Sequence, residues 1–126
     1  EQLRKTNRLQ LIDQPICKEL PNISFRYSHG HTQGLVISEI TAADQLIVFI
    51  SDLIPGIPWV HTPITMSSAR FPEQTVDEKQ AFLKEYCRRK ATLVFVHDPN
   101  TPSAKIIDQE GKFIGKETKI NHQDQY

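Results

Sequence analysis

Apolar and polar residues alternate in two stretches near the start of the chain, and this period of two is typical of half-buried strands. The first stretch, residues 9–11, is short. The second, residues 23–27, alternates Ile, Phe and Tyr with Ser and Arg. Residues 35–40 ("LVISEI") predict a further strand, and the charged residues 1–7 are expected to form the tail of a helix.

Two later stretches are continuously apolar. Residues 46–51 ("LIVFIS") predict a strand buried on both faces, and residues 92–96 ("TLVFV") predict another buried strand. Each stretch is followed directly by a polar residue, Asp52 and His97 respectively. Further along, residues 104–108 and 112–116 flank a glycine-containing turn and predict a hairpin.

One helix is expected between the two apolar stretches, over residues 75–89. Phe82, Leu83, Tyr86 and Cys87 would form its apolar face. The T-x-x-E pattern of Thr75 and Glu78 predicts a capping box at its start. Four prolines between residues 55 and 72 predict that this segment lacks regular structure.

The composition narrows the function classes. The 126 residues suit one domain, and 15 basic residues balance 15 acidic ones, so neither nucleic acid nor a membrane surface is expected as a partner through bulk charge. No apolar run reaches the roughly 20 residues of a membrane span. Cys17 and Cys87 are expected to be free thiols in a cytoplasmic protein, with a disulfide as the alternative.

Three potential metal ligands occupy similar places in the pattern. His31, Asp52 and His97 each follow a predicted strand, so they are expected to converge at one edge of the sheet. Imidazole and carboxylate groups are suitable ligands for zinc and similar divalent metals. Taken singly, each histidine is also explained as a turn or core residue, and Asp52 as a cap at a strand end.

Three motifs resemble those of the metallo-β-lactamase-fold hydrolases. They are "GHTQG" (residues 30–34), "VFISDLIP" (48–55) and "LVFVHDP" (93–99). The segment from residue 72 to 99 also resembles the helix and strand of lactonase-like members. The resemblance runs from about residue 8 to residue 115, and the motifs keep the family's order and spacing.

The resemblance implies an α+β fold, part of an αββα sandwich, in which residues 1–126 form the C-terminal portion as one mixed sheet with a covering helix. It implies two zinc ions: His31 would bind the first, His97 the second, and the catalytic Asp52 would bridge both. The ions would activate water for attack on an ester, lactone or related bond. Thr32 and Gly34 would shape the turn that carries His31.

The family's remaining ligands belong to an H-x-H-x-D-H motif that does not occur in these 126 residues. The chain alone is therefore expected to bind metal weakly and to catalyse poorly, because catalytic zinc usually has three protein ligands. Pairing with an N-terminal half or with a second copy is expected. The alternatives are a non-catalytic interaction module that self-associates through its exposed sheet, and a degenerate family member; Ala69 in the expected pocket favours the latter.

Four other residues are candidates for supporting roles. His29 could orient the site or be an exposed turn residue, and Asp98 could do the same or cap a turn. Trp59 and His61 could line a substrate pocket, or Trp59 could pack over the edge of the core. His122 is expected at the surface.

Overall fold

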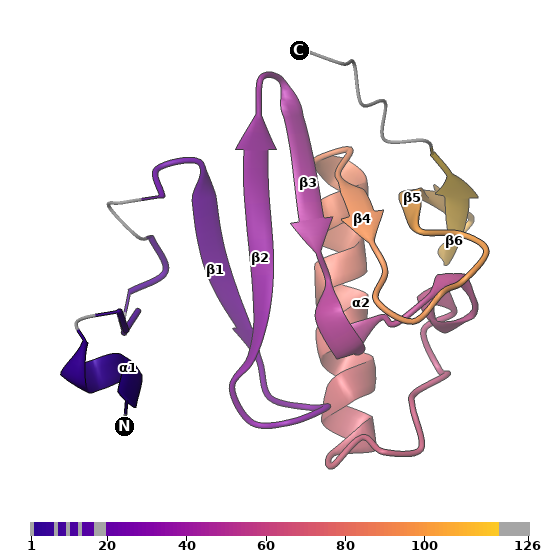
Figure 1. Ribbon diagram of the computed structural model, residues 1–126. Helices are drawn as coiled ribbons and strands as arrows, with labels where there is room; N and C mark the ends of the chain where they lie inside the picture. The colour runs from indigo at the N-terminus through magenta and orange to yellow at the C-terminus, as the bar shows by residue number, and fades with distance from the viewer. Residues whose placement is uncertain (1, 7, 10, 13, 17–19, 119–126) are drawn as a thin grey trace.

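The computed structural model describes residues 2–6, 8, 9, 11, 12, 14–16 and 20–118. The strands within these residues form one six-stranded sheet, in which they lie in the order of the chain (Figure 1). The strands are β1 (Ile23–Ser28), β2 (Leu35–Ala42), β3 (Gln45–Phe49), β4 (Thr92–Val94), β5 (Ser103–Gln109) and β6 (Lys112–Glu117). The helices are α1 (Gln2–Lys5) and α2 (Pro72–Arg88), with 3-10 turns η1 (Ser51–Leu53) and η2 (Ile57–Val60).

The sheet is mixed, because β3 and β4 pair in parallel and every other neighbouring pair is antiparallel. Parallel neighbours need a long crossover connection, and here it contains α2. Figure 1 shows α2 running along one face of the sheet, behind β3 and β4. The predicted α+β fold, one mixed sheet with a covering helix, is therefore confirmed.

The core lies between α2 and the sheet. Leu83 and Tyr86 of α2 are fully buried, as are Val48 of β3 and Leu93 of β4. Leu53 and Ile54, which follow β3, are also part of this cluster. The predicted apolar face of the helix is thus the face that packs on the sheet.

A buried carboxylate links the helix to the sheet. Glu39 of β2, 6% exposed, accepts hydrogen bonds from the Tyr86 hydroxyl (2.9 Å) and from both terminal nitrogens of Arg89 (3.1 and 2.9 Å). Arg26 of β1 lies 3.4 Å from the same carboxylate. Burial and the neighbouring Glu39 charge raise the pKa of Tyr86 above its ordinary value. These partners satisfy a charge whose burial would otherwise be costly.

The C-terminal hairpin agrees with its prediction. Strands β5 and β6 pair from Ala104 to Glu117 around a two-residue turn. Its residues, Glu110 and Gly111, have φ angles of 53° and 85°. Positive φ at both central positions is the geometry that matches the twist of a two-residue hairpin and favours glycine.

One strand prediction is wrong, and so is one prediction of burial. Residues 9 and 11 lie outside any strand, and Leu9 and Leu11 are 41% and 69% exposed. Strand β3 ends at Phe49 and is not buried on both faces: Val48 is fully buried against α2, whereas Phe49 on the other face is 36% exposed. An apolar run does not reveal whether a second layer covers its far side.

The predicted element boundaries also need correction. Helix α2 begins at Pro72, with Phe71 as N-cap, so Thr75 lies inside the helix and the expected capping box is absent. Proline is well suited to a first helical position because its missing N–H has no partner there anyway. Strand β4 ends at Val94, and η2 interrupts the segment predicted to be irregular.

No helix within the described residues is both long enough and apolar enough to cross a membrane.

Replacing Tyr86 with Phe should lower the free energy of unfolding by about 1–2 kcal/mol, because the buried Glu39 carboxylate loses a hydrogen-bond donor. Urea denaturation measures the change. Tyr27→Phe is the matched control: Tyr27 is 42% exposed, so its change should stay within about 0.5 kcal/mol. Equal effects of the two substitutions would contradict this account of the Glu39 cluster.

Candidate metal centre

The parallel pairing of β3 and β4 brings Asp52 and His97 together. Phe49 and Val94 are register partners at the ends of these strands. Asp52 and His97 each follow three residues later, so the two segments that leave these strands run side by side in the same direction. His97 Nε2 lies 3.0 Å from Asp52 Oδ1. The backbone N–H of His97 donates to the carbonyl of Pro55, which ties the two segments together (2.9 Å).

His31 reaches the same place from the β1–β2 connection. Strand β2 runs antiparallel to β3 and begins with Leu35, beyond the end of β3, so the connection lies at the end of the sheet where β3 and β4 finish. His31 Nε2 lies 3.6 Å from Asp52 Oδ2. The His31 side chain is buried, whereas those of Asp52 and His97 are 31% and 54% exposed. The structure thus brings all three predicted ligands together.

The atoms of this cluster suit a metal ion. Asp52 Oδ1 is buried and makes no hydrogen bond of regular geometry among the described residues, although buried polar atoms are normally paired. Two ligand atoms that share a tetrahedral zinc ion at about 2.0–2.1 Å lie roughly 3.3 Å apart, and the two Asp52–histidine distances, 3.0 and 3.6 Å, lie on either side of that value.

The cluster does not amount to a complete site for one ion. Within the described ranges, no group of three or more His, Cys, Asp and Glu side chains is arranged to hold a metal. Instead, each Asp52 oxygen faces a different histidine. The geometry therefore offers two half-sites that share one carboxylate.

The turn that carries His31 is packed directly on the start of α2. The carbonyl oxygens of Gly30 and His31 accept hydrogen bonds from the N–H groups of Phe71 and Arg70, both at 2.9 Å. A Cβ on Gly30 would lie 2.4 Å from the backbone nitrogen of Thr75. Only glycine can approach the helix backbone this closely.

Glu78 is the residue whose place the sequence pattern did not reveal. Its carboxylate accepts hydrogen bonds from the Ser28 hydroxyl and from the N–H groups of His29 and Gly30, and so contacts the turn before His31. Burial disfavours the charged form, but these hydrogen bonds outweigh it and lower the pKa of Glu78. The T-x-x-E pattern was its only signal, and that pattern indicated a cap.

Asp98 joins the segments that follow β3 and β4. Its Oδ2 accepts the N–H of Ile57 (2.9 Å), and its Oδ1 accepts those of Asn100 and Thr101 (3.1 and 2.8 Å). These backbone hydrogen bonds lower the pKa of Asp98. Asp98 therefore caps a turn, as one prediction had it, and also ties the loop after Asp52 to the loop after His97.

His29 and Thr32 lie on the exposed side of the turn. His29 Nδ1 accepts the N–H of Gly34 at 3.1 Å, which closes the turn. Gly34 has a φ of 78°, in the left-handed region that favours glycine. The Thr32 carbonyl accepts the N–H of Leu35 (3.2 Å). His29 and Thr32 therefore both contribute hydrogen bonds that close the turn carrying His31.

A buried lysine holds the loop that contains His61. Lys79 is fully buried, and its Nζ donates to the carbonyls of His61, Thr62 and Ile64 (3.1, 3.1 and 2.5 Å). Burial lowers the pKa of Lys79 to about 8. The His61 side chain is exposed, and Trp59 is half-buried against the core.

Cys87 is a free thiol, whereas Cys17 and His122 lie outside the described residues.

Solved structures align with nearly the whole chain. AidC, described as a dizinc quorum-quenching lactonase in complex with a product, aligns at 18% identity with a TM-score of 0.76, over 97% of this chain and 46% of that one. A probable metal-dependent hydrolase from Staphylococcus aureus aligns at 23% identity with a TM-score of 0.74, over 91% and 42%. The hydrolase AbOPH of the β-lactamase superfamily aligns at 16% identity with a TM-score of 0.74, over 95% of this chain and 42% of that one.

These alignments establish the fold. The chain has the architecture of metallo-β-lactamase-type hydrolases, as the resemblance predicted, and spans less than half the length of each matched structure. A scan of protein-family models finds no match to the chain. A search of curated proteins finds none either.

Replacing Gly30 with Ala should destabilise the chain by about 2–3 kcal/mol, because the added methyl group overlaps the Thr75 backbone and forces the turn away from α2. The free energy of unfolding in urea measures this effect. Gly34→Asn is the control, since a Cβ there would meet no atom within 4 Å and Asn tolerates positive φ. A cost at Gly34 as large as that at Gly30 would contradict the packing explanation.

Proposed function

We propose that this chain contributes one side of a dinuclear metal centre in a hydrolase. The observation that carries the proposal is the position of Asp52 between two histidines: its Oδ2 faces His31 and its Oδ1 faces His97. A carboxylate with its two oxygens directed to different ligands is suited to bridge two ions. In this proposal His31 binds the first ion, His97 the second, and Asp52 both.

The proposed reaction is hydrolysis of an ester, lactone or related bond. Zinc ions, when bound, would supply an activated water and polarise the substrate carbonyl. The residues of this chain would hold Asp52 and the histidines in place, with Asp98 joining the loops that carry Asp52 and His97. Trp59 and His61, on the segment after Asp52, are proposed to border the substrate pocket. The likeness to a dizinc lactonase supports this choice of metal and substrate class.

The proposal requires ligands from outside the described residues. His31 and Asp52 would give two protein ligands to one ion, and Asp52 and His97 two to the other, whereas catalytic zinc usually has three. We therefore propose that this chain alone binds metal weakly and catalyses poorly. Its free thiol at Cys87 supports the further proposal of a cytoplasmic location.

A second candidate function, binding of a partner, is supported by the sheet face opposite α2. We call this the open face; its apolar side chains are half-buried or exposed and come from four strands: Ile23, Phe25, Tyr27, Val36, Ile40, Ile47, Phe49 and Val94. Exposed apolar patches of this kind are typical of interaction sites. The proposed partner is a second apolar sheet, from a second copy or from a separate N-terminal half.

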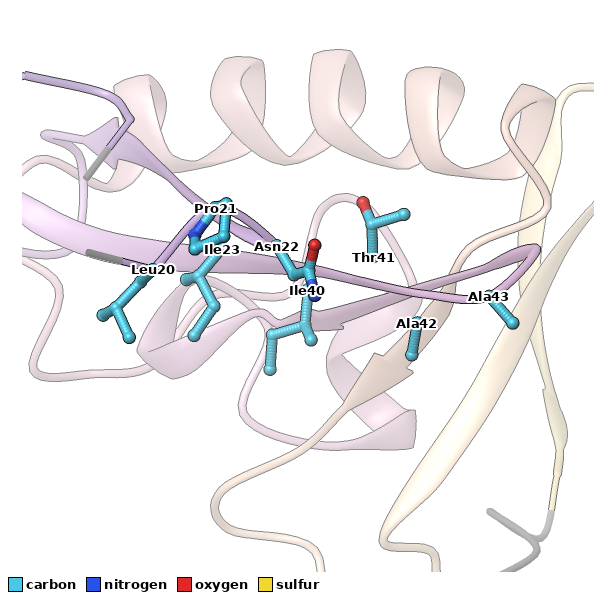
Figure 2. A pocket seen from close by; sticks show the side chains of 8 residues that line it. All are labelled: Leu20, Pro21, Asn22, Ile23, Ile40, Thr41, Ala42 and Ala43. Atoms are coloured by element: carbon cyan, nitrogen blue, oxygen red, sulfur yellow. The ribbon is translucent and has the colours of Figure 1, made fainter. Parts of the chain in front are cut away.

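A pocket at one end of the open face supports the same proposal. Its lining includes Leu20, Ile23 and Ile40, and Figure 2 shows these three side chains pointing to the side of the sheet away from the helix. The pocket lies at the opposite end of the β1–β2 hairpin from His31, because Ile23 and Ile40 are paired far from the connecting turn. An apolar side chain of the partner sheet could fill it without reaching the metal centre.

His97→Ala should weaken cobalt or zinc binding by about tenfold or more, because one half-site loses its only histidine. Calorimetric or optical titration of the chain measures the dissociation constant. His61→Ala is the matched control, since its imidazole is exposed and makes none of the Asp52 contacts described above. Unchanged affinity in the His97 variant would contradict the role given to His97.

Phe49→Glu should abolish self-association, because it places a charge at the centre of the open face. Light scattering during size-exclusion chromatography measures the molar mass, which is expected to exceed that of one chain at high micromolar concentration. Ile64→Glu is the control: Ile64 is 43% exposed but lies in the loop held by Lys79. A monomer at every concentration would contradict pairing with a second copy.

A further inference from the structure

Helix α2 holds the residues before His31 through a single side chain. The Glu78 carboxylate accepts the Ser28 hydroxyl at 2.5 Å, the N–H of His29 at 3.0 Å and the N–H of Gly30 at 3.0 Å. These are three consecutive residues, and they lie 48–50 positions away in the sequence. The contacts therefore define where the end of β1 stands relative to the helix.

Glu78 binds the donors of this segment at the point where strand pairing ends, whereas the Gly30 carbonyl is bound separately by the N–H of Phe71. Ser28 is the last residue of β1, and His29 lies beyond the strand. Ser28 and Gly30 are buried, so without the carboxylate their donors would be left unpaired at a cost of about 1–3 kcal/mol each. A carboxylate that accepts several N–H and O–H donors forms short, directional bonds.

The helix end of this contact is rigid. Three residues of α2 that follow Glu78, namely Phe82, Leu83 and Tyr86, are buried in the core. On the other side, Gln74 donates to Glu78 Oε1 at 2.9 Å and restricts the carboxylate further. Glu78 therefore links the Ser28–Gly30 segment to a helix whose position is determined by the core.

His31 is the next residue after the segment that Glu78 binds. The carbonyls on both sides of its Cα, those of Gly30 and His31, are held by the N–H groups of Phe71 and Arg70. With the preceding N–H groups bound by Glu78, the backbone before and after His31 is restrained, and its imidazole is left directed at Asp52.

We propose that Glu78 is a positioning residue of the metal centre: it binds the Ser28–Gly30 turn and thereby directs His31 toward Asp52. The effect on metal affinity rests on the proposed function, whereas the effect on the His31 ring does not. Glu78 contacts neither Asp52 nor His97 in the hydrogen bonds described above, so it acts through the backbone of the turn. Partners that orient a metal ligand typically change affinity by about 10–100-fold.

The test compares the chain with its Glu78→Gln variant, which keeps the size of the side chain but loses its charge and one acceptor. Asp77→Asn is the matched control, because Asp77 is the adjacent, exposed carboxylate on the same helix. Nuclear magnetic resonance without metal is the first readout. The His29 and Gly30 amide signals should move in the Glu78 variant, and the His31 ring signals should broaden or split. Titration with Co²⁺ is the second readout, with about a tenfold weaker affinity expected.

The outcomes separate the two proposals. A His31 ring that stays single and unshifted in the Glu78 variant overturns the positioning role, whatever happens to stability. If the unsubstituted chain shows no Co²⁺ binding at His31, the proposed metal function fails, and the ring signals still decide the role of Glu78. If Glu78→Gln does not fold, Ser28→Ala removes one donor of the contact and should move the same signals by less; no change there overturns the proposal.

Discussion

The parallel pairing of β3 with β4 determines both the path of α2 and the meeting of Asp52 with His97. Parallel neighbours must be joined by a long crossover, and α2 is that crossover. Because both strands run in one direction and their last residues are paired, the segments after them leave the sheet side by side. Asp52 and His97 stand three residues beyond the paired ends and so meet at 3.0 Å. The antiparallel hairpin of β1 and β2 turns at the same end and adds His31.

The crossover helix α2 also binds and positions the turn that carries His31. Its buried face packs on the sheet, and its side chains Glu78 and Lys79 hold two different loops. Glu78 binds the turn before His31, and Lys79 binds three carbonyls of the loop after η2. Adjacent residues of opposite charge thus bind N–H groups on one side and carbonyl groups on the other. The packing of one helix therefore determines the positions of loops from two parts of the chain.

The meeting of His31, Asp52 and His97 could be predicted from the sequence, because each follows a strand that its apolar pattern identifies. The role of Glu78 could not, since its partners lie about fifty residues away and its local pattern is also that of a capping box. The exposure of Phe49 was equally inaccessible: a continuous apolar run indicates burial but does not say whether a layer covers both faces. At residues 9 and 11, alternation over so few positions was too short to specify a strand.

If His31 and His97 bind metal on either side of Asp52, their imidazoles respond to the same ions. The ¹⁵N resonance of each imidazole, followed while the labelled chain is titrated with Zn²⁺, tests this. We expect the ring nitrogens of His31 and His97 to shift together as zinc is added, while those of His29 and His61 stay in place. Shifts confined to His29 and His61, or no shift at His31 and His97 at saturating zinc, would contradict it.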